Sequence, residues 1–570
     1  MTLELLLAEF DSLIQTPADV EKLNATILQW AVQGRLVPQC EDDEPVQELV
    51  KKIDADRENR IKARQIRRQN DLPEVEPEEQ LFTIPKNWKW IRLGEIGDWG
   101  AGATPSRRKP EYYDGTIPWL KTGELNDGYI GGAEEHVTEL ALNETSLRLC
   151  KPGDVLIAMY GATIGKLGIL EIEATTNQAC CACTPFEGVF NRFLFMHLFA
   201  MRTHFREQGA GGAQPNISRT KIIATPFPLP PLAEQKRIVA RVDELLGQTA
   251  VLTQQLASVH EQRRGVHTAV LHQLTQATTK TSEVSSERSS PTSEVSTLAA
   301  HFDRFYVDAD TVAELKQAIL QLAVQGRLVP QDERDEDAAV LLERIQEEKK
   351  RLIKQGEIPK SRNSTTFSEN QILYTIPASW EWCNINDISY KVTDGEHSTP
   401  IRSEEGYFLL SARNVTNEGI DLSNVDFVEQ EEFDRIRKRC DPDKGDVLIS
   451  CSGSVGRIAI VDEDYKYVMV RSAALVKHDH VNVKSEYLAF ALRSPILQEQ
   501  IESKSKKSAQ ANLFLGAIKS LLIPLPPLNE QKRIVAKVDE LFALCDQLAG
   551  QLTTTAATRT QLLEAVLAQA

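Results

Sequence analysis

Residues 27–39 read ILQWAVQGRLVPQ and residues 319–331 read ILQLAVQGRLVPQ, so the two stretches differ only at Trp30 and Leu322. Residues 83–90, TIPKNWKW, return as TIPASWEW at 375–382. Residues 229–245, LPPLAEQKRIVARVDEL, return at 525–541 with 15 of 17 positions identical. Between these matched segments the two halves diverge strongly. The pattern predicts a scaffold that is used twice and presents two different recognition modules in one fixed geometry.

The bulk properties are typical of a chain with several domains. The chain has 570 residues, of which 41% are hydrophobic, which is enough for sizeable cores. No run of 18 apolar residues predicts a transmembrane helix, and the first residues lack the basic segment of a signal peptide. The nine cysteines have irregular spacing, which is typical of reduced thiols. We therefore expect a cytoplasmic protein.

The charge is acidic overall but unevenly distributed. A net charge of −17 argues against a protein that binds nucleic acid over its whole surface. Residues 81–230 nevertheless carry 15 basic and 15 acidic side chains, whereas residues 373–527 carry 18 and 23. A local basic loop is therefore still compatible with a polyanion.

Each half has the same order of parts. A short helix precedes a charged helical stretch. In the first half Pro17 lies near the start of the short helix and Gly34 ends it, and in the second half we expect Asp310 as its N-cap and Gly326 at its end. A mixed α/β region and a long helix come next. The boundaries we predict are an N-terminal helical segment (1–80), a first recognition domain (81–231), a central long helix (232–275), a Ser/Thr-rich linker (276–300), a second helical segment (301–372), a second recognition domain (373–527) and a C-terminal long helix (528–570).

The two long helices show apolar residues at alternating four- and three-residue spacing. Eight of ten such positions are apolar in each helix, which is typical of a coiled coil. Two separate core helices are the simpler alternative. We predict an antiparallel intramolecular pair, which gives the duplicated chain a pseudo-twofold symmetry. Together with the mixed α/β regions, this predicts an α/β (α+β) fold with internal duplication. The positions are Ile238, Val242, Leu245, Thr249, Leu252, Leu256, Val259, Arg263, Val266 and Val270, and Ile534, Val538, Leu541, Cys545, Leu548, Leu552, Thr555, Arg559, Leu562 and Val566.

No catalytic motif is evident in the sequence. GATIGK at 161–166 has one residue too few between its glycines for a phosphate loop, and Leu167 stands where such a loop needs Ser or Thr. We interpret it as a tight turn between two strands. CCAC at 180–183 has no second Cys or His pair with metal-site spacing, so buried strand thiols are the better interpretation. We expect no metal site and no enzymatic activity in this chain.

Polar loops in the two divergent regions are the candidate binding residues. They combine cations, which contact phosphates or guanine edges, with Thr, Asn and Gln side chains that can contact bases. Each loop taken alone is equally compatible with an ordinary solvated surface, but the loops recur at corresponding places in both halves. The candidates are Arg107, Arg108, Lys109, Lys121, Thr122, Lys166, Gln214, Asn216, Ser218, Arg413, Asn414, Arg457, Lys504, Lys506, Lys507, Gln510 and Asn512.

Together these motifs resemble the specificity subunits of type I restriction–modification systems. The resemblance rests on the duplicated AVQGRLVP, the duplicated TIPxxWxW, the GDVLI strand with its following turn, and PLPPLxEQKRIVAxVDEL before a long helix. It covers nearly the whole chain. It implies two target-recognition domains that each read one half of a bipartite double-stranded DNA site, while the long helices set the gap. The helical segments before each recognition domain make this chain longer than the shortest pattern of the family.

The resemblance also implies partners and cofactors. Two modification (methyltransferase) subunits would bind the helices and carry S-adenosylmethionine, and restriction (motor-nuclease) subunits would use ATP and Mg. This chain would hold no cofactor. Two alternatives stay open from the residues alone: a DNA-modifying enzyme with fused catalysis, and an assembly scaffold whose variable domains bind proteins.

Overall fold

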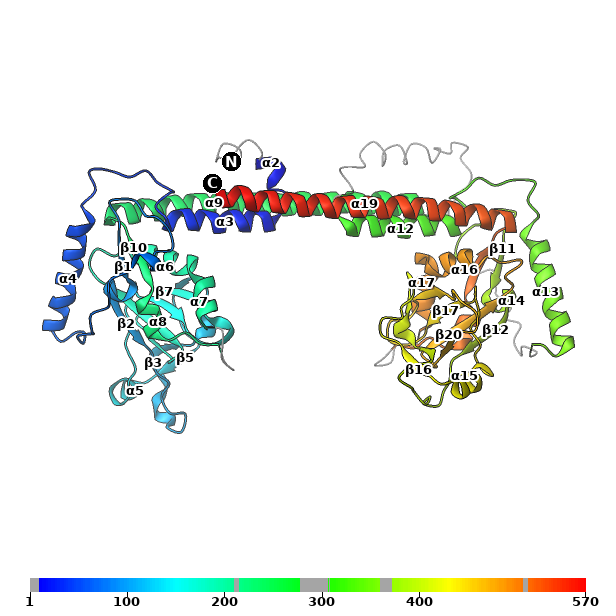
Figure 1. Cartoon of the computed structure of the whole chain (residues 1–570), viewed down its shortest axis with the longest axis horizontal. Helices are drawn as coiled ribbons and strands as arrows, with labels where there is room; N and C mark the ends of the chain where they lie inside the picture. Colours follow the sequence, from blue (N-terminus) through cyan, green and yellow to red (C-terminus); the bar gives the residue numbers. More distant parts are fainter. Residues whose placement is uncertain are drawn as a thin grey trace. The chain divides into compact units, whose positions relative to one another are not determined.

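The computed structural model describes residues 10–209, 215–276, 306, 308–358, 372–505 and 511–569, and it divides into two compact units (Figure 1). Unit 1 comprises residues 1–259 and 559–570, and unit 2 comprises residues 260–558. The predicted linker at 276–300 lies almost entirely outside the described residues. Among the described residues no helix is long and apolar enough to cross a membrane.

Most helices of the two units correspond in order, apart from α2 and α14, which have no α-helical counterpart among the described residues. Unit 1 contains α2 (Phe10–Leu13), α3 (Pro17–Val32), α4 (Val46–Lys62), α5 (Glu139–Glu144), α6 (Asn191–Ala200), α7 (Arg202–Gly209), α8 (Arg219–Ala224) and the start of α9 (Leu232–Thr275). Unit 2 contains α12 (Ala309–Val324), α13 (Ala338–Gln355), α14 (Ile385–Ile388), α15 (Gln430–Arg437), α16 (Ser485–Arg493), α17 (Pro495–Lys504), α18 (Leu515–Lys519) and the start of α19 (Leu528–Gln569).

The two short helices of the duplicated motif, α3 and α12, each have a side-chain N-cap. At α3, Thr16 and Asp19 form a reciprocal capping box. The predicted cap at Asp310 is wrong, because Asp308 caps α12 by accepting a hydrogen bond from Thr311 N at 2.9 Å. Asp310 lies within the first turn of the helix, where its negative charge still faces the positive end of the helix dipole.

The strands of the first domain form three sheets. The strands are β1 (Lys89–Arg92), β2 (Gly97–Ala101), β3 (Tyr113–Leu120), β4 (Gly128–Ile130), β5 (Glu135–Val137), β6 (Val155–Ala158), β7 (Leu167–Leu170), β8 (Thr175–Thr176), β9 (Cys180–Pro185) and β10 (Pro226–Leu229). Their orders are β1-β10, β2-β9-β6-β7-β4 and β5-β3-β8.

The second domain repeats this topology despite its different sequence. Its strands are β11 (Glu381–Asn384), β12 (Ser389–Asp394), β13 (Tyr407–Leu410), β14 (Val415–Thr416), β15 (Gly419–Ile420), β16 (Asp426–Val428), β17 (Val447–Ser450), β18 (Ile458–Ile460), β19 (Tyr467–Met469), β20 (Ala473–His478) and β21 (Leu522–Leu525). The orders β11-β21 and β16-β13-β19 match those of the first domain, and β12-β20-β17-β18 matches the first four strands of β2-β9-β6-β7-β4; the second domain has a separate β14-β15 hairpin and, among its described residues, no strand paired like β4. The predicted mixed α/β domains and internal duplication are confirmed.

The GATIGK and CCAC motifs are structural, as predicted. GATIGK forms the turn between β6 and β7, where Gly161 and Gly165 adopt φ values of +65° and +79°. These values lie in the left-handed region that favours glycine. The cysteines of CCAC lie in β9 and are fully buried, and burial raises the pKa of the Cys181 thiol to about 12. A buried neutral thiol is chemically inert.

The three duplicated motifs meet at one junction in each unit. Gly34 and Gly326 end α3 and α12 with positive φ, and at Gly34 a Cβ atom would lie 2.5 Å from Pro85 and 2.9 Å from Trp88. Pro377 and Trp380 crowd Gly326 in the same way. Only glycine satisfies both constraints, which explains why QGRLVP and TIPxxW are repeated together.

The first turn of each long helix completes the junction with buried polar side chains. Glu234 accepts a hydrogen bond from Gln39 at 2.6 Å, and Glu530 accepts one from Gln331 at 2.5 Å. The adjacent Gln235 accepts from Phe190 N at 2.8 Å and donates to the carbonyls of Gly188 and Pro230.

Gln531 makes the same three bonds in unit 2, to Lys484 N at 2.8 Å and to the carbonyls of Asn482 and Pro526. Both glutamine side chains are fully buried. Each therefore ties the loop before a domain helix to the start of a long helix.

The heptad prediction holds for only part of each long helix. The start of α9 shares a unit with the end of α19, and the reverse holds in unit 2, as expected for an antiparallel pair. However, Val266 is 50% exposed and Leu562 is 45% exposed, while the next residues, His267 and Leu563, are buried.

Helix geometry explains this shift of one residue. In a straight helix a residue 29 positions on returns to within about 20° of the same face, whereas one 28 positions on lies about 80° away. His267 is 29 residues after Ile238, and Leu563 is 29 residues after Ile534. A strict seven-residue repeat is expected for supercoiled helices. The buried residues of α9 and α19 instead follow the spacing of a straight helix.

Replacing Gln531 with Ala should lower the free energy of unfolding of unit 2 by about 1–3 kcal/mol, because it leaves buried backbone groups without partners. Urea denaturation measures this, with hydrogen exchange at Lys484 N as the local readout. Gln551→Ala, at an exposed position of the same helix, is the matched control. Equal stability of the two variants would contradict a role for the buried glutamine.

Candidate nucleic-acid interface

In the first domain, the turn between β6 and β7 carries a cation beside an exposed amide. Lys166 ends the turn, half-buried, and its ammonium has no side-chain partner among the described residues. Asn216 is exposed and pairs as a β-bridge with Tyr160, which begins the turn. Backbone bonds from Gly161 N to Pro215 O and from Ile217 N to Met159 O, both 2.9 Å, hold the two segments together.

The second domain has the same arrangement between β17 and β18. Arg457 is at the place of Lys166, is exposed, and its guanidinium has no partner within the described part of the chain. Asn512 pairs as a β-bridge with Ser452, and Leu513 N donates to Cys451 O at 2.9 Å. The structure therefore brings together two pairs of predicted residues, Lys166 with Asn216 and Arg457 with Asn512.

An exposed aromatic ring accompanies each pair, and the sequence did not single it out. Tyr160 is 41% exposed in the first domain, and Phe514 is 54% exposed in the second. An aromatic ring beside a cation and an amide suits contact with nucleotides. Tyr160 follows an apolar stretch that predicts burial, so only the tertiary structure reveals its exposure.

A second arrangement lies at the edge of the β5-β3-β8 sheet. Glu135 on β5 pairs in register with Trp119 on β3 and binds two predicted cations. Arg107 Nη2 lies 2.6 Å from its carboxylate, and Lys121 forms an ion pair with the other oxygen. The Arg107 guanidinium also lies 4.3 Å from the ring centre of Tyr113.

The equivalent carboxylate in the second domain is Asp426 on β16, which pairs with Leu409 on β13. Arg413, a predicted residue, and Arg402, which was not predicted, lie 3.1 Å and 3.0 Å from it. Arg402 lies in the loop before β13, and nothing in its local sequence indicates that it contacts Asp426. In both domains one edge-strand carboxylate thus holds two exposed or half-exposed cations.

The ion pairs of Glu135 stabilise the charged forms of its carboxylate and of Lys121. Lys121, and then Arg107, lowers the pKa of the Glu135 carboxyl, and the same contact raises the pKa of Lys121. Fixed cations of this kind are already oriented for an anion. The carboxylate offsets part of their charge, so each arrangement provides positioned donors with little net positive charge.

The remaining predicted residues have varied surroundings. Arg108 is exposed without a side-chain partner among the described residues, Lys109 donates to the Tyr112 hydroxyl at 2.7 Å, and Thr122 begins a short 3-10 turn. Ser218 caps α8. Gln214, Lys506, Lys507 and Gln510 lie outside the described residues.

Two predicted residues have internal structural partners. The Asn414 side chain is buried and bonds to Ser411 and to the carbonyls of Asp421 and Asn424. Lys504 donates to the carbonyl and hydroxyl of Ser520 at the end of α17. These geometries disfavour base or phosphate contacts by the two side chains, because both amide donors of Asn414 and two of the three ammonium donors of Lys504 are already used.

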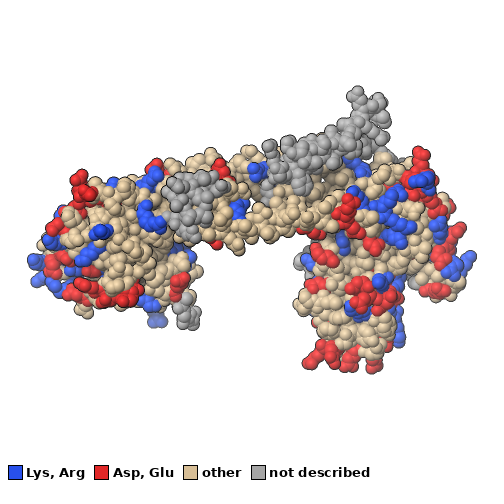
Figure 2. All heavy atoms as spheres, turned by 45° about the horizontal axis from the view of Figure 1, so that its top comes forward, with Lys and Arg blue, Asp and Glu red and all other residues tan. Residues whose placement is uncertain are grey.

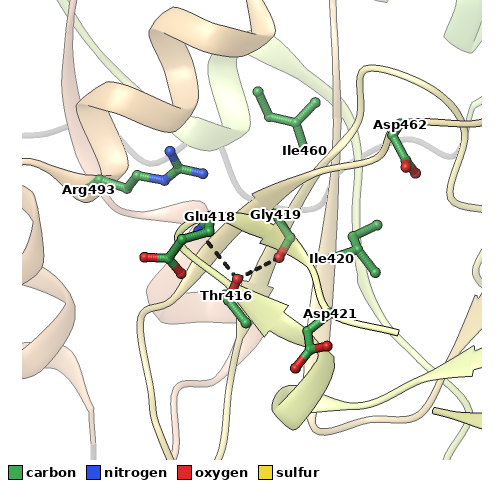
Figure 3. A pocket seen from close by; sticks show the side chains of 8 residues that line it. All are labelled: Thr416, Glu418, Gly419, Ile420, Asp421, Ile460, Asp462 and Arg493. Carbon is green, nitrogen blue, oxygen red and sulfur yellow. Dashed lines mark hydrogen bonds between the residues drawn. The ribbon is translucent and has the colours of Figure 1, made fainter. Parts of the chain in front are cut away.

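A pocket of about 700 Å³ lies beside the β14–β15 hairpin of the second domain (Figure 3). Its polar lining consists mainly of the carboxylates of Glu418, Asp421 and Asp462 and the guanidinium of Arg493. Arg493 is held by two bonds to Ile458 O, and burial lowers its pKa. Three acidic groups against one basic group disfavour a phosphate in this pocket.

Charges are mixed over the rest of the surface that can be seen. Figure 2 shows Lys and Arg interspersed with Asp and Glu on the visible face of both units. Among the described residues no group of three or more His, Cys, Asp or Glu side chains could hold a metal ion.

Comparison with known proteins identifies the family. The model of the type I restriction modification DNA specificity domain matches residues 85–261 and, a second time, residues 377–556. The chain belongs to this family.

Two specificity subunits are similar over almost the whole length of the chain. The type I restriction enzyme EcoAI specificity subunit of Escherichia coli is 28% identical, with 96% of this chain and 93% of the relative covered. The EcoEI specificity subunit of Escherichia coli is 26% identical with the same coverage. The crystal structure of the HsdS subunit from Thermoanaerobacter tengcongensis is 18% identical, covers 86% of this chain and 98% of its own, and has a TM-score of 0.40.

Each match to the specificity-domain family includes one turn cation, one bridging asparagine and one edge-strand carboxylate. The first contains Lys166, Asn216 and Glu135, and the second contains Arg457, Asn512 and Asp426. The two specificity domains therefore share positions for polar contacts, with the same asparagine at the bridge and different residues at the turn cation and the edge-strand carboxylate.

Lys166→Ala and Arg457→Ala should each weaken DNA binding by the assembled complex, because each removes an unpaired cation. If the side chain contacts a base, the loss should be about 1–3 kcal/mol and specificity should relax in one half of the site only. If it contacts phosphate, affinity should fall evenly and the salt slope should shrink by about one. Titrations at several salt concentrations separate these results, with the exposed Lys89→Ala and Lys438→Ala as controls. Two variants that bind like their controls would exclude both turns from the interface.

Proposed function

We propose that this chain is the sequence-reading subunit of a type I restriction–modification complex, in which each domain reads one half of a bipartite DNA site. The observation that carries this proposal is the repetition of equivalent cation positions on divergent domains. Glu135 and Asp426 occupy the same edge-strand position and each orient two cations. One topology with different side chains at the same places is suited to reading two different sequences.

The chain supplies recognition and the partners supply catalysis in this proposal. The methyltransferase subunits bind S-adenosylmethionine, and the motor-nuclease subunits bind ATP and Mg. The inert buried thiols and the turn role of GATIGK favour a chain without its own cofactor. The net charge of −17 further suggests that partner subunits contribute much of the phosphate contact.

Two methyltransferase subunits fit the duplicated scaffold. Exposed apolar side chains on α9 include Val251, Val259 and Val266, with exposures of 55%, 43% and 50%. Apolar residues exposed on a long helix are suited to packing against partner helices. The charged helices α4 and α13, which precede the domains at equivalent places, provide a further candidate surface for these partners.

Replacing residues 81–231 with the corresponding domain of the EcoAI specificity subunit tests this function. Methylome sequencing of a host that also expresses the partner methyltransferase should show one changed half-site. The other half-site and the gap should stay the same. Replacing residues 373–527 is the matched experiment and should change the other half. An unchanged methylated sequence after both replacements would favour a scaffold that binds proteins through its variable domains.

Lengthening both long helices should lengthen the gap in the DNA site. Four residues inserted after Leu252 and four after the equivalent Leu548 add about 6 Å of helix and rotate the remainder of each helix by roughly 40°. If the complex assembles, both half-site sequences should persist because the domains are untouched. Methylome sequencing reports sequences and gap together. The same insertion within 276–300 is the control, and an unchanged gap with lengthened helices would show that they do not set the spacing.

A further inference from the structure

The end of each long helix packs in the unit where the other long helix begins. Leu563, Val566 and Leu567 of α19 belong to the core of unit 1. Leu271 and Leu274 of α9 pack with Ala318 of α12 in unit 2. The two helix ends therefore occupy equivalent positions, one against α3 and the other against α12.

In unit 1 one ion pair places a basic residue on α3 opposite an acidic residue on α19, and a second pair places an acidic residue on α3 opposite a basic residue on α19. Lys22 lies 2.5 Å from Glu564. Arg559 of α19 donates to Gln15 at 2.7 Å and lies 3.4 Å from the Asp19 carboxylate. Asp19 is buried, so this last contact also neutralises a carboxylate within the interface.

In unit 2 the sign at the equivalent place is reversed. Glu314 of α12 occupies the position of Lys22 in the duplicated motif. It lies 3.2 Å from Arg264 and 3.1 Å from Nδ1 of His267 on α9. The His267 side chain is fully buried and its ring lies 5.1 Å from that of Tyr306.

The helix ends differ at the matching positions. Thr560, Leu563 and Glu564 of α19 correspond to Arg264, His267 and Thr268 of α9. We infer that these residues form a charge code that directs each helix end to its own short helix, α19 to α3 and α9 to α12, and rejects the exchanged pairing. This inference does not depend on the proposed function.

The exchanged pairing would bring like charges together at both sites. Lys22 would face Arg264, and Glu314 would face Glu564. Such an arrangement would arise if one half of the chain paired with the same half of a second copy. Unfavourable contacts in the wrong pairing are an established source of specificity between helices.

The code acts on the choice of partner more than on total stability. Lys22 and Glu564 have side-chain exposures of 33% and 58%, so solvent screens their attraction. The apolar residues around them supply the general attraction between the helices. Because α3 and α12 have apolar residues at the same positions, and the helix ends differ in apolar character only where Leu563 corresponds to His267, charge is the main feature that distinguishes one short helix from the other.

Transferring the code between the helix ends tests the inference in the full-length chain. T560R/L563H/E564T gives the end of α19 the residues of α9 and should lose protection against hydrogen exchange over residues 559–569, by about two- to fivefold. Adding K22E gives α3 the charge of α12 and should restore the protection. Light scattering should show that the unrescued variant forms two-copy assemblies more readily.

A simpler pair of variants keeps the test independent of the packing of Leu563. K22E and E564K should each accelerate exchange, and K22E/E564K should return it to the level of the original chain. Glu21→Lys, on the exposed face of α3, is the control for a charge reversal without a partner. The inference is overturned if K22E changes hydrogen exchange no more than Glu21→Lys does. It is also overturned if K22E does not restore protection in T560R/L563H/E564T and K22E/E564K is no better protected than its single variants.

Discussion

A buried glutamine at the start of each long helix is the constraint on which the rest of the structure depends. Gln235 and Gln531 satisfy three backbone groups each and leave no alternative position for the loops that they hold. Breaking one such buried bond leaves its partner without water or protein to replace it. Each domain is thereby tied to the helix that comes after it, so the direction of the helix and the orientation of the domain are coupled.

This junction explains why the repeated segments are so similar while the domains differ. The short helix, the TIPxxW turn and the LPPL helix start meet at one place, and a change in one requires changes in the others. The residues at the sheet edges and turns are not constrained in this way. Glu135 and Asp426, or Lys166 and Arg457, can therefore vary in identity at constant geometry, which is what two readers of different sequences require.

The long helices and their short partner helices share most of their apolar positions but differ in their charged residues. The apolar positions of the long helices follow the geometry of a straight helix and are nearly the same in both, which provides attraction without selectivity. The reversed charges at Lys22 and Glu314 distinguish the two short helices. A duplicated scaffold needs such a difference, because otherwise each half could pair equally well with its own duplicate in another molecule.

The sequence by itself determined the duplication, the order of the elements, the strand–turn–strand units and the mixed α/β class, because these depend on local periodicity and on glycine or proline at specific places. It also indicated the turn cations and Arg107 with Lys121. Only the tertiary structure decided that Asn414 and Lys504 have internal partners, that Arg402 joins Arg413 at Asp426, and that Tyr160 is exposed. The tertiary structure also decided that His267, and not Val266, lies on the buried face of α9. The physical reason is that hydrogen-bond partners and exposure depend on how separate loops and strands pack together in space, whereas helix and turn propensities are set by neighbouring residues.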